Sequence, residues 1–244
     1  MLQEHQYKEE KIVKKYYAIA IDGPSGAGKS SLARKLAEEF SFIYVDTGAI
    51  YRTLALAAIR ENIDRKDEAA VMELLPRLDI TMGYNESGEQ RMYLNGEDVS
   101  EKIRTPEVSV GASDVSAHGK VREYLLEMQR KLARENNVIM DGRDIGTVVL
   151  PDARLKIFLT ASSEARAERR MKELLAKGMN VTFKEVLKDI EYRDAQDSAR
   201  EAAPLKKAVD AILVDTSEID FQQSLELLRS IVSEKLFNNE DRTK

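Results

Sequence analysis

Residues 22–31, Asp-Gly-Pro-Ser-Gly-Ala-Gly-Lys-Ser-Ser, have the composition and spacing of a loop that binds phosphate. They satisfy the pattern G-x-x-x-x-G-K-[ST] with Gly23, Gly28, Lys29 and Ser30. Glycines let the backbone turn so that several N–H groups point at one anion, and a following helix adds the positive end of its dipole. Lys29 would supply a charge for the β and γ phosphates, and Ser30 a hydroxyl ligand for magnesium. The pattern predicts a nucleoside triphosphate site.

A second set of charged residues could bind a second anion. Arg52 comes shortly after the apolar run 42–45, and Arg143 and Asp144 follow the run 138–140. Open α/β sheets bind ligands at the carboxyl edge of their strands, where both arginines would lie. An isolated Arg-Asp pair would be ordinary, but arginines gathered beside a phosphate loop are costly without an anion between them. The pair of arginines therefore favours a second phosphate site.

A helix predicted to begin at Ser162 carries three more arginines, Arg166, Arg169 and Arg170, on neighbouring surface positions. Like charges at this spacing repel by a few tenths of a kcal/mol, so a bound polyanion or nearby carboxylates would relieve the cluster. Arginines on an exposed helix are also common, and this simpler interpretation stays open.

A capping box at 182–185 opens the next helix, which we expect to end at Ala202. Arg193, Asp197 and Arg200 lie at i, i+4 and i+7 and share one face of it. The alternative to a ligand-binding face is an exposed ladder of ion pairs. Together the two helices resemble a mobile lid.

These residues must be positioned by a larger framework, and five short apolar runs indicate a parallel sheet. Each run is nearly continuous rather than alternating, as in strands covered on both faces, and helical stretches separate them. They are residues 16–21, 42–45, 138–140, 155–159 and 211–214. The pattern predicts a doubly wound α/β core.

Residues 78–99 have a different hydrophobic pattern, because apolar and polar residues alternate in 78–84 and 90–94. Turn residues at 85–88 and the pair Asn95-Gly96 separate these segments, and Asn-Gly is a strong hairpin signal. We predict a small antiparallel insert. Helical pattern returns over 107–135, with a break near Gly119.

A final amphipathic helix is predicted after Ser217 and Asp220. Its apolar residues are expected in the core: Ile219, Leu225, Leu227, Leu228, Ile231, Val232 and Leu236.

Composition excludes several classes of protein. The net charge of −5 argues against a nucleic acid polymer as partner, and no apolar run is long enough to span a membrane. With no cysteine, disulfides and thiolate chemistry are excluded. The charged residues 1–15 lack the apolar core of a signal peptide and are expected to be a solvated extension. We expect a cytoplasmic monomer.

The chain resembles the bacterial cytidylate kinases, a branch of the nucleoside monophosphate kinase family. The resemblance covers residues 18 to about 236 and rests on the phosphate loop, on 46–52 (Asp-Thr-Gly-Ala-Ile-Tyr-Arg) and on 141–149 (Asp-Gly-Arg-Asp-Ile-Gly-Thr-Val-Val), followed by 151–153 and the Arg193 helix. Many enzymes share the loop, but the other two segments are much more particular to this family.

The resemblance implies a P-loop three-layer α/β fold with a five-stranded parallel sheet, a small antiparallel monophosphate-binding insert and a helical lid. The kinase domain would cover 16–236, with core segments 16–73, 112–160 and 203–236, the insert at 74–111 and the lid at 161–202. Residues 237–244 would form a polar tail.

The resemblance also implies roles for individual residues. ATP would contact Gly23, Pro24, Ser25, Gly26, Ala27, Gly28, Lys29, Ser30, Ser31, Arg166, Arg169 and Arg170, with magnesium on Ser30. The monophosphate would contact Thr47, Tyr51, Arg52, Ser113, Arg122, Arg143, Asp144, Arg193, Asp197 and Arg200. Within that set, Arg52, Arg143 and Arg193 would hold its phosphate; Ser113, Arg122 and Asp144 the cytosine; and Asp197 and Arg200 the ribose. Lys29, Arg143 and Arg193 would be catalytic.

The expected reaction is ATP-dependent phosphorylation of CMP and dCMP. A carboxylate such as Asp144 can distinguish the exocyclic amine of cytosine from the O4 of uracil. No general base is required, since a monophosphate oxygen is already ionised, and neither His5 nor His118 is an expected catalyst. The alternatives are a kinase for UMP or dTMP, a nucleotide switch, and a structural protein with a vestigial loop. A switch is disfavoured because the sequence has no D-x-x-G and no N-K-x-D.

Overall fold

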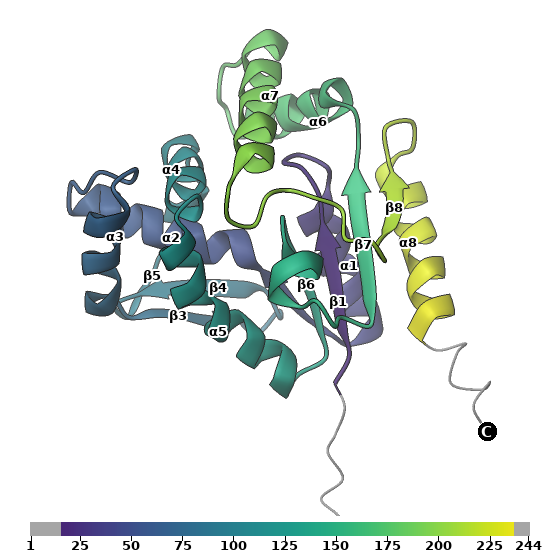
Figure 1. Cartoon of the computed structure of the whole chain (residues 1–244). Helices are drawn as coiled ribbons and strands as arrows, with labels where there is room; N and C mark the ends of the chain where they lie inside the picture. Colours follow the sequence, from purple (N-terminus) through teal and green to yellow (C-terminus); the bar gives the residue numbers. More distant parts are fainter. Residues whose placement is uncertain (1–15, 237–244) are drawn as a thin grey trace, which may run out of the picture.

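A computed structural model describes residues 16–236; the predictions for 1–15 and 237–244, and His5, lie outside this range. Figure 1 shows the arrangement of the elements. In chain order they are β1 (Ala18–Asp22), α1 (Lys29–Phe40), β2 (Ile43–Asp46), α2 (Thr47–Arg60), α3 (Glu68–Leu74), η1 (Leu75–Arg77), β3 (Ile80–Tyr84), β4 (Gln90–Leu94), β5 (Glu97–Asp98), η2 (Lys102–Arg104), α4 (Pro106–Ser116), α5 (Gly119–Glu135), β6 (Val138–Gly142), η3 (Ile145–Val149), β7 (Leu155–Thr160), α6 (Ser163–Ala176), α7 (Phe183–Ala199), β8 (Ile212–Asp215) and α8 (Phe221–Leu236).

The five predicted core strands form one parallel sheet in the order β2-β6-β1-β7-β8. The central strand β1 is buried on both faces, which explains its unbroken apolar sequence. Ile19 and Ile21 pack with α1 and α8, whereas Ala20 packs on the opposite side with η3 and α5. Helices therefore cover both faces of the sheet, and the predicted three-layer α/β class is confirmed.

The predicted antiparallel insert is confirmed as the sheet β3-β4-β5. Asn95 and Gly96 both have positive φ, as a two-residue type I′ hairpin requires. Side chains of the insert bind the outer edge of β2: the Tyr84 hydroxyl donates to the Tyr44 carbonyl at 2.9 Å. The Gln90 carboxamide bonds both backbone groups of Asp46, at 2.7 and 3.2 Å. These bonds replace a neighbouring strand and fix the start of α2 against the insert.

The two helices predicted to form a lid, α6 and α7, stand above the carboxyl edge of the sheet (Figure 1). The predicted caps at Ser162 and Thr182 both form, the second as a complete capping box. The expectation that α7 continues to Ala202 is wrong, because it ends at Ala199. Pro204 disfavours helical geometry in the residue before it, and Ala203 takes a positive φ of 53°.

The C-terminal helix forms as predicted, but two of the expected core residues do not belong to the core. Ile219 precedes α8, is only half-buried and is not part of the cluster that α8 joins. Leu225, Leu228 and Val232 are buried on one face of α8, spaced by three and four residues. Leu227 points away from that face and is 42% exposed, so its assignment to the core is wrong. None of the helices in the described range 16–236 is long and apolar enough to cross a membrane.

Candidate active site

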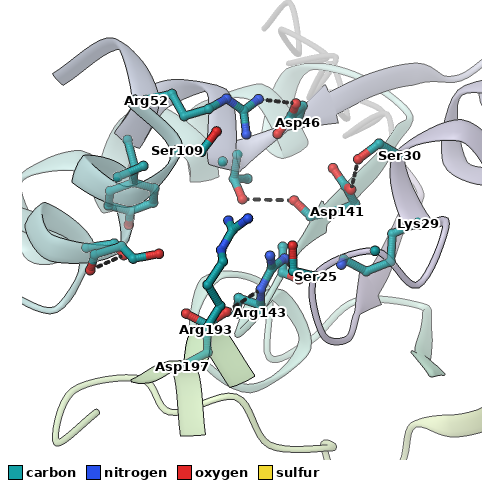
Figure 2. Close-up of a pocket in the computed structure, with 18 of the residues that line it drawn as sticks. Ser25, Lys29, Ser30, Asp46, Arg52, Ser109, Asp141, Arg143, Arg193 and Asp197 are labelled. Atoms are coloured by element: carbon teal, nitrogen blue, oxygen red, sulfur yellow. Dashed lines mark hydrogen bonds and ion pairs between the residues drawn. The ribbon is translucent and has the colours of Figure 1, made fainter. Parts of the chain in front are cut away.

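A cleft of about 480 Å³ opens at the carboxyl edge of the sheet, between the phosphate loop, α2, α4 and α7. It brings together predicted residues that are up to 175 positions apart in sequence, from Ser25 to Arg200. Seventeen residues of the predicted sites line it: Ser25, Gly26, Gly28, Lys29, Ser30, Ser31, Thr47, Tyr51, Arg52, Ser113, Arg122, Arg143, Asp144, Arg170, Arg193, Asp197 and Arg200. Figure 2 shows part of this cleft, including Arg52, Arg143 and Arg193 pointing into it.

The phosphate loop has the backbone geometry that its glycines predict. Gly26 and Gly28 have φ of 77° and 86°, and Gly28 begins α1. A side chain at Gly23 would collide with the Leu159 carbonyl, since its Cβ would lie 1.9 Å from that oxygen. Gly23, Pro24 and Ala27 do not line the cleft but shape the loop. The loop thus presents N–H groups and a helix N-terminus to the cleft, as a phosphate site requires.

Lys29 is buried in this loop, and its ammonium donates to the Pro24 carbonyl at 2.8 Å. Burial, and then the positive charge of Arg143, lower the pKa of Lys29 below its usual value. An anion bound between Lys29 and Arg143 would favour the charged ammonium and restore that pKa. The electrostatics therefore favour a phosphate group at this point.

Asp141, at the end of β6, was not among the predicted site residues. Its carboxylate accepts from the Ser30 hydroxyl at 2.8 Å and from the Tyr44 hydroxyl at 3.1 Å. Burial, and then the nearby carboxylate of Asp46, raise the pKa of Asp141 to about 6. A cation would offset both effects. The signal available in the sequence was an acidic residue ending an apolar strand, the position that holds magnesium in P-loop enzymes.

The donor set fits magnesium bound together with a nucleotide. In the described part of the chain no cluster of three or more acidic or histidine side chains could hold a metal alone. Magnesium typically uses one or two protein ligands and completes its shell with phosphate oxygens and water. The Ser30 hydroxyl and the Asp141 carboxylate supply such a pair.

Three predicted arginines converge on the cleft (Figure 2): Arg52 from α2, Arg143 from the loop after β6, and Arg193 from α7. Arg52 pairs with Asp46 at 2.7 Å, and Arg143 with Asp197 at 2.8 Å. Although burial acts to raise the pKa of Asp46, Arg52 holds it below its usual range.

Arg193 differs from the other two, since it makes no ion pair with any residue in 16–236. Its Nε is buried with no hydrogen-bond partner among those residues. Burial, and then the charge of Arg143, lower its pKa to about 10. The nearby Asp197 carboxylate only partly opposes this fall, so an anion that enters the cleft would stabilise the charged form of Arg193.

The predicted base-binding residues lie at one end of the cleft. The Arg122 guanidinium pairs with the Asp144 carboxylate, donates to the Ser116 carbonyl at 3.1 Å and lies 5.3 Å from the centre of the Tyr51 ring. Ser113 lines the same part of the cleft from α4. The Nε of Arg122 is buried and has no hydrogen-bond partner within the described residues, so this end of the cleft holds an N–H donor without an acceptor.

Asp197 is almost fully buried and accepts hydrogen bonds from both Arg143 and Arg200. Burial acts to raise the pKa of Asp197, but these two guanidiniums hold it below its usual range. The Thr47 hydroxyl, also expected to contact the substrate, donates instead to the Asp141 carbonyl at 2.8 Å. In this structure Thr47 thus supports the strand end that carries Asp141.

The structure separates the three arginines of α6. Only Arg170 lines the cleft, where it pairs with Glu173 at 3.0 Å. Arg166 is buried and donates to the Ser25 carbonyl and to Asp194, which attaches the lid to the phosphate loop. Arg169 donates to Thr216, after β8. Neither Arg166 nor Arg169 is among the residues that line the cleft.

The fold and this site are those of a P-loop phosphotransferase, with an arginine-lined cleft beside the phosphate loop. A family model described as cytidylate kinase matches residues 19–234. A cytidylate kinase from Carboxydothermus hydrogenoformans is 50% identical over 217 residues, covering 89% of this chain and 97% of that protein. One from Caldanaerobacter subterraneus is 51% identical over 208 residues, covering 85% and 91%. The chain belongs to the cytidylate kinase family.

Proposed function

We propose that the protein transfers the γ-phosphoryl group of ATP to CMP and dCMP, forming CDP or dCDP and ADP. The observation that carries the acceptor assignment is Arg193, a half-buried arginine that makes no ion pair within 16–236, has a buried and unbonded Nε, and lines the same cleft as Arg143 and the phosphate loop. Family membership supports the same reaction. The family expectation is thereby confirmed, and the predicted residues now have positions from which each role can be argued.

On the donor side, the backbone of 23–28 and Lys29 would hold the β and γ phosphates. Ser30 and Asp141 would hold magnesium, which supplies charge neutralisation on the phosphate oxygens when it is bound. Arg170, at the mouth of the cleft, could reach the triphosphate. Arg166 would act through its bond to the Ser25 carbonyl, keeping the loop and the lid together.

On the acceptor side, Arg52, Arg143 and Arg193 would hold the monophosphate and turn one of its oxygens toward the γ-phosphorus. Phosphoryl transfer requires the attacking and leaving oxygens to be in line and the charge between them to be neutralised. The attacking oxygen is already ionised, so no residue has to remove a proton. Closure of α6 and α7 over the cleft would bring Arg193 onto the transferring group and exclude water.

At the base end, Asp144 would accept from the exocyclic amine of cytosine, while Arg122 holds the carboxylate in place. Uracil carries O4 where cytosine carries its amine, so two hydrogen-bond acceptors, O4 and the Asp144 carboxylate, would face each other. Asp197 and Arg200 would contact the ribose, a contact that helps binding but is not required, in keeping with acceptance of dCMP. We further infer a cytoplasmic monomer.

A panel of monophosphates with coupled detection of ADP tests this function. Purified protein with ATP and magnesium should produce ADP with CMP and dCMP, and much less with UMP, dTMP or AMP. No CMP-dependent ADP at any magnesium concentration would overturn the proposal. Turnover with UMP or dTMP alone would reassign the acceptor and keep the reaction class.

A further inference from the structure

Asp22 is a buried carboxylate that lies between the donor and acceptor sites without lining the cleft. It ends β1, directly before Gly23 of the phosphate loop pattern, and is 3% exposed. Its two oxygens each accept one hydrogen bond, from the backbone N–H groups of Ile145 and Gly146, both at 2.7 Å. Asp22 therefore joins the start of the donor loop to η3, a segment 123 residues further along the chain.

The segment held by Asp22 follows directly after Arg143 and Asp144. Asp144 occupies the position before η3 whose side chain would normally accept from the first N–H groups of the turn. It makes no such bond, and its carboxylate pairs with Arg122 at the base end of the cleft instead. Asp22 accepts from the Gly146 N–H, which an N-cap side chain at Asp144 could otherwise bind, and also from the Ile145 N–H, so the Asp144 carboxylate stays paired with Arg122 at the cleft.

Space beside this contact is limited at Gly146. A Cβ at Gly146 would lie 3.4 Å from an Asp22 oxygen and 3.1 Å from the Lys156 side chain. Only a carboxylate can accept on both of its oxygens at once, since an Asn side chain would turn a donor toward one of the N–H groups. Burying a carboxylate here is costly, and the two backbone N–H groups offset part of that cost.

We propose that Asp22 is a positioning residue for the acceptor: it fixes Arg143 and Asp144 relative to the donor loop through the backbone of Ile145 and Gly146. This inference rests on the proposed function, because it assumes that Arg143 and Asp144 bind the monophosphate. Asp22 itself touches neither nucleotide. Its loss should therefore weaken acceptor binding and alignment while leaving the phosphate loop able to bind ATP.

The test is Asp22→Asn, which keeps the shape of the side chain and removes one acceptor. In this variant the carboxamide NH₂ would face the backbone N–H of Ile145 or Gly146. We expect the Kd for CMP to rise about tenfold and kcat to fall about tenfold, while the KM for ATP changes less than about threefold. Isothermal titration with CMP and steady-state kinetics with each substrate measure this split. Asp22→Ser, which retains one acceptor and leaves room for water, should show the same split if the Asn variant does not fold.

Asp67→Ala is the matched control. Asp67 also accepts two backbone N–H groups, at the start of α3, but it is exposed and lies outside the cleft. Its loss should lower the melting temperature without changing either substrate's constants. Equal losses for ATP and CMP in the Asp22 variants, or no loss for CMP, would overturn the positioning role. A wild-type protein that is inactive on CMP would instead overturn the proposed function.

Discussion

Nε of Arg143 donates a 2.8 Å hydrogen bond to the carboxylate of Asp197, so the loop after β6 and the lid helix α7 are joined across the cleft. Asp197 accepts from Arg200 as well, and one buried carboxylate thus faces two guanidiniums. Arg193, one turn earlier on α7, has no such partner among the described residues. The lid is therefore anchored at Asp197 and has an uncompensated charge at Arg193, beside the place where phosphate would be transferred.

Arg193→Ala should lower kcat on the order of a thousandfold, as removal of other arginines that neutralise a transferring phosphoryl group does. Coupled ADP detection at saturating ATP and CMP measures the effect. Arg229→Ala is the control. Arg229 lies on the exposed side of α8 and pairs with Glu39 of α1, so its replacement should leave kcat unchanged. A loss of less than about tenfold in the Arg193 variant would contradict its role.

Asp144→Asn should reduce the preference for CMP over UMP by about tenfold or more. The carboxamide presents an N–H group, which suits the O4 of uracil better than the amine of cytosine. The measurement is the ratio of kcat/KM for the two monophosphates. An unchanged ratio, even with lower activity on both, would show that Asp144 does not read the base.

Asp141→Asn should raise the magnesium concentration needed for half-maximal activity by about tenfold, because it removes a charged oxygen ligand beside Ser30. Titrating magnesium at fixed ATP and CMP measures this shift. The KM for CMP should change little at saturating magnesium. A variant with the wild-type magnesium curve would place the metal elsewhere.

The advantage of the wild type over Asp22→Asn should depend on pH. Burial raises the pKa of Asp22 to about 6; the two backbone N–H groups and Lys29 oppose this rise, and Asp144 adds to it. Below that pKa the carboxyl is protonated and, like the carboxamide, carries a donor. The wild-type to variant ratio of kcat/KM for CMP should therefore shrink as the pH falls from about 8 to about 5.

Titration of the nucleotide phosphates affects both proteins equally and cancels in this ratio. A ratio that stays constant over the same range would contradict the requirement for an ionised Asp22. The same ratio measured with Asp67→Ala in place of Asp22→Asn should stay close to one at every pH, because Asp67 lies far from the cleft.

The sheet and the insert could be predicted because their signals are local. Unbroken apolar runs mark buried parallel strands, and Asn95-Gly96 marks a hairpin whatever surrounds it. The errors arose at the margins of helices, at the end of α7 and beside the buried face of α8. Leu227 fits an amphipathic pattern but lies just outside the buried stripe of α8, and Ala203 takes a positive φ in a segment whose composition is helical.

The candidate site could be predicted in its residue types but not in its pairings. Arg166, Arg169 and Arg170 are equivalent in sequence, yet only the fold shows that the first binds the phosphate loop, the second the segment after β8, and the third lines the cleft. Asp22 and Asp141 were overlooked for the opposite reason. Each carboxylate acts through a partner more than 100 positions away, which no local spacing reveals.

The two hydrogen bonds between the Gln90 carboxamide and the backbone of Asp46 matter for engineering the chain. With Tyr84, Gln90 occupies hydrogen-bonding groups along the outer edge of β2, which would otherwise be free to pair with a strand of another molecule. Excising the insert to make a minimal kinase would uncover that edge. A shortened protein would consequently be prone to aggregate through β2, and would need a charged or proline residue placed there to stay in solution.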